Sequence, residues 1–173
     1  RMSKIARMMQ QATAGAGGAG LDVDEVFSTH LYEGGSNPVT ITNNIDLSGE
    51  GGLVWIKARK NIQNPDYHGL VDTERGARSE LNSSLTSGAN SVSSGFFSFN
   101  SNGFSLNSTY LANATVNSSG EDYVSWTWRK APKFFDVVQF TNSTGGDEDV
   151  SHNLGSVPGM IIVRNLANGY SWQ

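Results

Sequence analysis

Residues 51–60 read GGLVWIKARK and predict a glycine turn that leads into a buried β-strand. Residues 53–56 are wholly apolar, and Lys57 is the first side chain of the stretch that favours water. A second stretch, PGMIIVRNLA at residues 158–167, has the same order of glycine, apolar run and basic residue. The chain therefore contains one strand pattern twice.

Short strands separated by turn residues are predicted along the chain from residue 21 onward. In YVSWTW, residues 123–128, successive side chains alternate between two faces, so Val124, Trp126 and Trp128 share one face. Residues 79–94 are almost wholly polar and predict a long loop. The predicted strands are residues 26–32, 39–42, 53–57, 68–72, 95–99, 103–107 and 123–128. This spacing indicates a mainly β fold, an antiparallel β-sandwich of the jelly-roll or concanavalin-like kind.

The composition agrees with that fold class and excludes several partners. Charged residues make up only 16% of the 173 residues and glycine occurs 20 times, as expected of a β chain with many turns. A net charge of −4 gives no basic surface for nucleic acid. There is no cysteine, and no apolar run approaches the roughly 20 residues that span a bilayer, so neither disulfides nor membrane insertion are expected.

The two halves of the chain correspond at a nearly constant spacing. The matched parts are Phe27 with Phe135 at an offset of 108 (135 − 27), ITNNI (41–45) with VSHNL (150–154) at 109, and GLVWIK (52–57) with GMIIVR (159–164) at 107. The offset changes only in turns, where insertions cost little. We interpret this as a repeated module of about 105 to 110 residues, an ordinary length for a sandwich domain.

The N-terminal residues 1–13, RMSKIARMMQQAT, predict a short helix. Its apolar side chains have the seam spacing of a coiled coil, and they are Met2, Ile5, Met9 and Ala12. A single helix of this length is marginal in water, so we expect it to dock on another protein. Residues 14–24, which begin AGAGGAG, predict a flexible linker.

Residues 25–132 predict a first complete sandwich module, and residues 133–173 predict the start of a second, incomplete repeat. The second repeat lacks counterparts of most strands of the first. We therefore expect it to be completed either by polypeptide that continues beyond Gln173 or by another subunit.

Five motifs of the chain occur in the order found in a known group of proteins. They are GGLVWIKAR (51–59), LVDTERGA (70–77), SFNSNGFSL (98–106), EDYVSWTWRKAPKFFDVVQF (121–140) and VSHNLGSVPGMIIVR (150–164). This series resembles the repeated domain of tail-fibre-like virion proteins of marine bacteriophages, notably those that infect cyanobacteria. The resemblance covers most of residues 21–172, and the opening stretch from residue 3 to residue 29 also looks like the N-terminus of such proteins.

The resemblance implies a structural or host-facing part of a phage particle, located in the tail. It implies partners among the other tail proteins, reached through the N-terminal helix, and a host surface glycan at the distal end. A homo-oligomer is expected, and a trimer in particular, because fibres are commonly threefold. The resemblance supplies no catalytic residues.

Two other function classes stay open. A carbohydrate-binding module would use Trp126 and Trp128 as glycan contacts, although core packing is the favoured interpretation of this face. A polysaccharide-degrading enzyme would need two carboxylates across a groove, and LDVDE at residues 21–25 has the nearest spacing.

The remaining chemistry indicates a protein that is not an enzyme and carries no metal or cofactor. His30, His68 and His152 are too scattered for a zinc site, and no catalytic or nucleotide-binding motif is present. Asp72 and Arg75 are predicted to form a buried or half-buried pair that pins a loop over the sheet.

Overall fold

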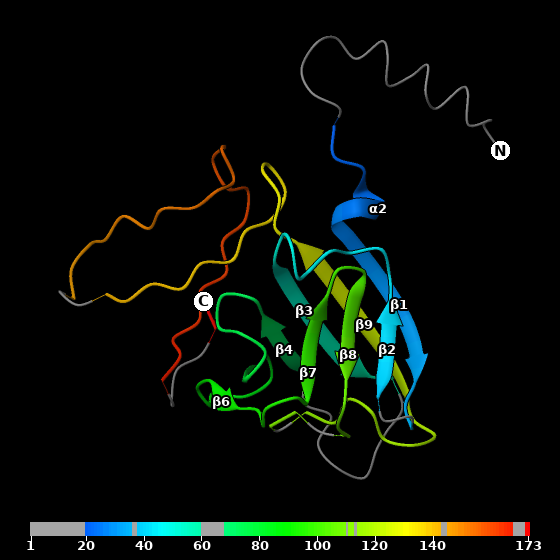
Figure 1. Ribbon diagram of the computed structural model, residues 1–173. Coiled ribbons are helices and arrows are strands. Elements are labelled where there is room, and N and C mark those ends of the chain that lie inside the picture. Colours follow the sequence, from blue (N-terminus) through cyan, green and yellow to red (C-terminus); the bar gives the residue numbers. More distant parts are fainter. Residues whose placement is uncertain are drawn as a thin grey trace, which may run out of the picture.

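The fold is an antiparallel β-sandwich, as the sequence predicts. The computed structural model describes residues 20–35, 38–59, 68–109, 111–112, 114–142, 145–167 and 172–173. A three-stranded sheet lies in front of a six-stranded sheet in the view of Figure 1. All strand pairs are antiparallel.

The described elements are one short helix and nine strands. They are α2 (Val23–Val26), β1 (Phe27–Glu33), β2 (Val39–Thr42), β3 (Gly52–Ala58), β4 (Gly69–Asp72), β5 (Ser79–Asn82), β6 (Asn90–Ser91), β7 (Phe97–Asn100), β8 (Gly103–Leu106) and β9 (Asp122–Arg129). The six-stranded sheet has the order β1-β9-β3-β4-β5-β6, and the three-stranded sheet has the order β2-β8-β7.

Strands β3 and β9 form the centre of the six-stranded sheet. They pair in register from Gly52↔Arg129 to Ala58↔Tyr123. A Cβ atom on Gly52 would lie 2.0 Å from the carbonyl oxygen of Trp128, so only glycine lets the two backbones approach this closely. The glycine that the sequence places before the apolar run is thus part of the strand itself.

The core lies between the two sheets. Alternate residues of β3, namely Val54, Ile56 and Ala58, are buried, and Tyr123 of β9 lies on the same side. The three-stranded sheet and the loops contribute Ile41, Ile45, Leu47, Val92, Phe97, Phe104, Leu106, Leu111, Ala114 and Val116. Burial of these side chains supplies most of the driving force for folding.

The predicted long loop at residues 79–94 is wrong, because this stretch contains β5 and β6. Glu80, Leu81 and Asn82 are almost wholly buried. The Glu80 carboxylate accepts a hydrogen bond of 3.0 Å from the backbone N–H of Ala114, which satisfies one of its polar atoms inside the protein. A polar sequence can therefore form a buried strand when its polar atoms find partners.

The predicted linker also ends in regular structure. Asp22 caps α2 through its side chain, which accepts from the backbone N–H of Asp24, and acidic residues occupy the first turn as helix starts favour. Residues 23–24 are therefore helical. The predicted helix at residues 1–13 and most of the linker lie outside the described residues.

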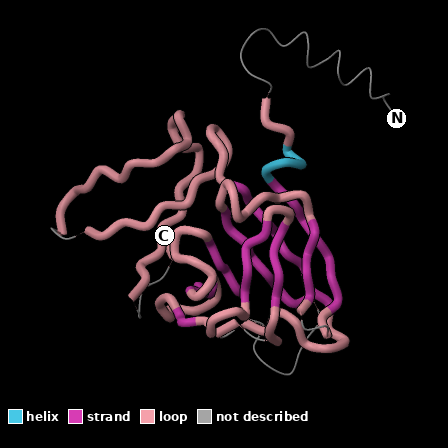
Figure 2. The backbone as a smooth tube through the Cα atoms, in the orientation of Figure 1, coloured by secondary structure: helices cyan, strands magenta, loops and turns pink. Residues whose placement is uncertain are grey.

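The C-terminal segment, residues 133–173, adds no named strand to either sheet among its described residues, and it runs beside the sandwich in Figure 2. It exposes large apolar side chains: 92% of Val157, 78% of Met160, 70% of Ile161 and 60% of Ile162 are accessible. Adjacent residues point to opposite sides in an extended chain, so both sides of this segment face solvent. The segment has the apolar sequence of a central β-strand, but among the described residues neither sheet includes it.

Candidate functional site

The aromatic side chains of β3 and β9 gather on the outer face of the six-stranded sheet, away from the three-stranded sheet. Val54, Ile56 and Tyr123 face the core, so their neighbours in the chain must face outward. We call the resulting cluster the aromatic face, and it comprises Phe27, Trp55, His68, Trp126, Trp128 and Phe135.

The expectation that Trp126 and Trp128 pack in the core is wrong. The core side of β9 carries Tyr123, Ser125 and Thr127, all with no exposed surface, whereas the two tryptophans are half-buried. Thr127 is accommodated inside because its hydroxyl accepts a hydrogen bond of 2.9 Å from the side-chain amide of Asn43. The larger side chains of β9 thus lie on the outside of the sandwich.

Ring contacts hold the aromatic face together. The Trp55 ring lies 5.9 Å from Trp126 at 72°, and 6.4 Å from Trp128. Trp55 donates its indole N–H to Nδ1 of His68 at 2.9 Å, which fixes the orientation of the indole. Phe135, from the turn after β9, stacks on Trp128 at 6.2 Å and covers one end of the cluster.

A buried ion pair lies at the end of β4, as the sequence predicts. Arg75 contacts the Asp72 carboxylate at 2.6 Å through Nε and at 2.5 Å through a terminal nitrogen, and both side chains are more than nine-tenths buried. The same guanidinium donates to the backbone carbonyls of Ser79 and Leu70. Burial lowers the pKa of Arg75, and Asp72 and Glu80 offset part of that lowering. The pair pins the turn between β4 and β5.

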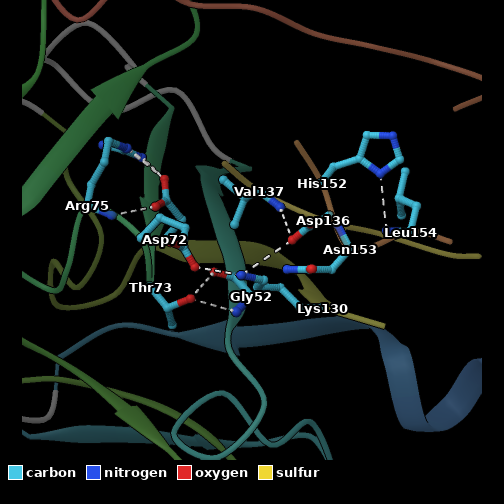
Figure 3. Close-up of polar contacts among 11 residues, drawn as sticks. Gly52, Asp72, Thr73, Arg75, Lys130, Asp136, Val137, His152, Asn153 and Leu154 are labelled. Carbon is cyan, nitrogen blue, oxygen red and sulfur yellow. Dashed lines mark hydrogen bonds and ion pairs between the residues drawn. The ribbon is translucent and has the colours of Figure 1, made fainter. Parts of the chain in front are cut away.

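A second polar cluster joins the C-terminal segment to the sandwich (Figure 3). Lys130 lies 2.6 Å from the Glu74 carboxylate and 3.3 Å from Asp136. Asp136 also accepts hydrogen bonds from the backbone N–H groups of Val137, at 3.0 Å, and Asn153, at 2.7 Å. The hydrogen bond to Glu74 is the main cause that raises the pKa of Lys130. The cluster is a structural anchor for the residues that follow β9.

Two local geometries of the predicted first module recur in the C-terminal segment. The side chain of Asn43 accepts from the N–H of Ile45, and at the matching position the side chain of His152 accepts from the N–H of Leu154. The offset is 109 in both cases (152 − 43 and 154 − 45).

The second recurrence is the start of a β-hairpin. In the first module Ile56 pairs with Gly69, the first residue of β4. At the position matching Ile56, Val163 exchanges two backbone hydrogen bonds with Gln173, of 2.9 and 3.0 Å. Arg164 follows in register with Trp172. The pairing of β3 with β4 is therefore begun again by the second copy of the strand pattern.

A protein-family model described as a domain of unknown function (DUF7483) matches residues 22–173. The chain belongs to the DUF7483 family. No curated protein and no solved structure matches it. The DUF7483 match runs through both predicted modules without a break, and the division at residues 132 and 133 stays a prediction.

The described part of this DUF7483 chain places the other candidate residues apart from one another. The carboxylates of residues 21–25 lie on and before α2, where Asp22 acts as a helix cap rather than facing a second acid across a groove. His30 is on β1, His68 precedes β4 and His152 lies in the C-terminal segment.

Within the described residues, no group of three or more His, Cys, Asp or Glu side chains is arranged to hold a metal ion. No helix in that part of the DUF7483 chain is long and apolar enough to cross a membrane. The predicted docking residues Met2, Ile5, Met9 and Ala12 lie outside the described residues.

Proposed function

We propose that this chain is a structural virion protein, a tail fibre or fibre-like appendage of a bacteriophage, which acts by assembly and not as an enzyme. Its N-terminus anchors it to the tail, and its β-modules are displayed toward the host. The proposal rests on the sequence resemblance together with one structural observation, the hairpin that begins again at Val163 and Gln173. A chain that restarts the same strand pairing is organised as a series of modules, and such a series spans distance and presents surface.

The anchor in this proposal is the N-terminal seam of Met2, Ile5, Met9 and Ala12. Seam spacing of this kind suits parallel helices around a common axis, and a homotrimer is the assembly we propose. The partner of the seam is another tail protein of the same particle.

The test of location is immunogold electron microscopy on native phage particles, with antibodies raised against the purified chain. Gold at the tail is the expected result. Its loss after the antibodies are pre-absorbed with the chain is the control. Particles that contain no chain by mass spectrometry and carry no gold would rule the proposal out.

The test of the anchor is a charge placed on the seam. Ile5→Asp with Met9→Asp should abolish incorporation of the chain into particles, because two carboxylates cannot be buried in a helix interface. Gln10→Asp with Gln11→Asp adds the same charge off the seam and should leave incorporation unchanged. Equal incorporation of both double variants would contradict a docking role for the seam.

A carbohydrate-binding module is the second candidate function. The observation that favours it is the position of Trp126 and Trp128 on the outer face of the sheet. There they are half-buried and are not part of the core. Glycan binding without any association with a particle would favour this function over the first.

A further inference from the structure

Within the aromatic face, the half-buried Trp126 lies beside an exposed residue of β1, Thr29. The cross-strand register places Trp126 directly between Thr29 of β1 and Trp55 of β3. The same row continues from Trp55 to Leu70 of β4 and Leu81 of β5. One line of side chains therefore crosses five strands of the sheet.

Exposure along this row falls from β1 toward β5. Thr29 is exposed, Trp126 and Trp55 are half-buried, and Leu70 and Leu81 are each only 5% exposed. The β4 and β5 end is closed by packing, so Leu70 and Leu81 are unavailable to a ligand. The accessible part of the row is the step from Thr29 to Trp55, with Trp126 at its centre.

The surface formed by Thr29, Trp126 and Trp55 is suited to binding a sugar ring, and less suited to binding a flat surface of another protein. The Trp55 and Trp126 rings meet edge to face at 72°, so they form a corner in which one ring face and one ring edge are presented together. The Trp55 N–H is already bonded to His68, which holds this corner rigid. Thr29 brings a hydroxyl to the open side of Trp126. An apolar ring face with a hydroxyl beside it matches a pyranose, which has an apolar C–H face and a rim of hydroxyl groups.

The charge of the row limits the class of glycan. None of Thr29, Trp126, Trp55, Leu70 and Leu81 carries a charge. The nearest lysine on β3 is Lys57, in the neighbouring row. Its ammonium already donates a hydrogen bond of 3.1 Å to the carbonyl of Ala58. An anionic sugar would find no arginine in this row to bind its carboxylate or sulfate.

We propose that the corner formed by Trp126, Trp55 and Thr29 binds a neutral glycan, with one sugar ring stacked on Trp126. This deepens the proposed function, on which it rests for its biological setting, by naming the class of host-surface ligand. Trp126 supplies the stacking surface, Thr29 hydrogen-bonds the rim of the sugar, and His68 positions Trp55. Phe135 shields Trp128, so Trp128 supports the site from behind.

The test is affinity gel electrophoresis of the 173-residue chain in gels that contain laminarin, mannan or dextran as neutral polysaccharides, or alginate as an acidic one. We expect at least one neutral polysaccharide to retard the wild-type chain, and alginate to retard it no more than a gel without sugar. Trp126→Ala should weaken the interaction about tenfold or more, since one aromatic stacking platform is lost. Trp126→Tyr should recover part of it, because a ring remains.

Two matched variants separate stacking from general effects. Phe140→Ala removes a ring that is 46% exposed in the segment after β9 and should leave retardation unchanged. Leu31→Ala removes a 57% exposed apolar side chain on the β1 side of the same face, and it should also leave retardation unchanged. Unaltered circular dichroism and melting temperature of Trp126→Ala show that the fold persists.

The proposal is overturned if no neutral polysaccharide retards the wild-type chain, or if Trp126→Ala is retarded as strongly as the wild type. An equal loss with Leu31→Ala would also overturn it, and would indicate a broad protein-docking surface. Incorporation of Trp126→Ala into phage particles is measured separately. Normal incorporation without glycan binding refutes only the glycan site, whereas absence of the wild-type chain from particles refutes the virion role.

Discussion

Asp72 and Arg75 depend on each other because both charges are removed from water. Breaking such a pair leaves one uncompensated buried charge. Asp72→Asn should therefore lower the free energy of unfolding by about 3 kcal/mol, as expected when a buried pair loses one partner. The measurement is urea unfolding followed by tryptophan fluorescence. The double variant Asp72→Asn with Arg75→Met should recover part of the loss, and a single-variant effect below about 1 kcal/mol would contradict a paired buried charge.

Substitutions of Ser125 and Thr127 are expected to change stability in opposite directions, although the two residues are neighbours on the core side of β9. Among the described residues the Ser125 hydroxyl has no hydrogen-bond partner, whereas Thr127 accepts from Asn43. Ser125→Ala should leave stability unchanged or raise it by about 1 kcal/mol, and Thr127→Val should lower it by about 2 kcal/mol by leaving the Asn43 amide without its acceptor. Denaturant unfolding of the two variants checks both. A larger loss for Ser125→Ala than for Thr127→Val would reverse this assignment.

At the scale of elements, Lys130 ties the turn after β4 to the residues after β9. Its raised pKa means that its contribution to stability is complete below the ordinary lysine pKa of about 10.4 and is lost as the pH rises past the raised value. The effect is small because the main partner of Lys130, the Glu74 carboxylate, is exposed and solvent screens the pair. We expect the difference in melting temperature between wild type and Lys130→Met to narrow from pH 8 to pH 11.5.

The difference in melting temperature between wild type and Lys130→Met reports the contribution of Lys130 alone. Burial raises the pKa of Tyr32 well above its ordinary value, and this group, present in both, affects both melting curves alike. A difference in melting temperature that stays constant across this pH range would show that Lys130 acts through packing of its alkyl chain instead of its charge.

The segment from Val157 to Val163 has an apolar surface that water does not favour. We expect the chain to associate through this segment at high concentration, because an extended apolar stretch outside a sheet readily pairs with another strand. Ile161→Glu with Ile162→Lys should reduce the association, measured by sedimentation velocity over a range of concentrations. Ser156→Glu, an exposed position just before the segment, is the control. Unchanged association in the Ile161 and Ile162 variant would place the contact elsewhere.

For the whole molecule, the stable unit should be the sandwich. All buried members of the core cluster fall between Ile41 and Tyr123, and the C-terminal segment contributes none. Limited proteolysis with thermolysin should therefore cut first between residues 157 and 163, where apolar residues are exposed, and leave a resistant fragment that still unfolds cooperatively. Mass spectrometry identifies the cut sites. Early cleavage within β3 or β9 would contradict this order of stability.

The strand prediction succeeded where apolar residues and turn residues alternate clearly. The strands around residues 39–42, 53–57 and 103–107 lie within a residue or so of their observed bounds. The buried strand β5 was not predicted because its sequence, SELN, is polar. Its burial depends on hydrogen bonds from distant residues such as Ala114. The pattern of apolar and polar residues along the chain does not reveal hydrogen-bond partners that are distant in the sequence.

The candidate site shows the same limit. Local alternation correctly grouped Val124, Trp126 and Trp128 on one face, but the choice of that face as the interior was wrong. A strand specifies two faces, and which one is covered depends on the position of the second sheet and on the partner that Asn43 offers Thr127. The hydrogen bond from Trp55 to His68 likewise joins β3 to the residue before β4, and no local sequence pattern predicts it.

The sequence by itself determined the strand periodicity and the ion pair of Asp72 and Arg75, because each depends on neighbours in the chain, and it shows one strand pattern twice. The close contact at Gly52 is different, because it joins β3 to the distant Trp128. Only the tertiary structure decided which side of β9 faces outward, that a polar stretch becomes a buried strand, and that the apolar segment near Ile161 lies uncovered. These outcomes depend on which sheet packs against which face, and that packing joins residues far apart in the chain.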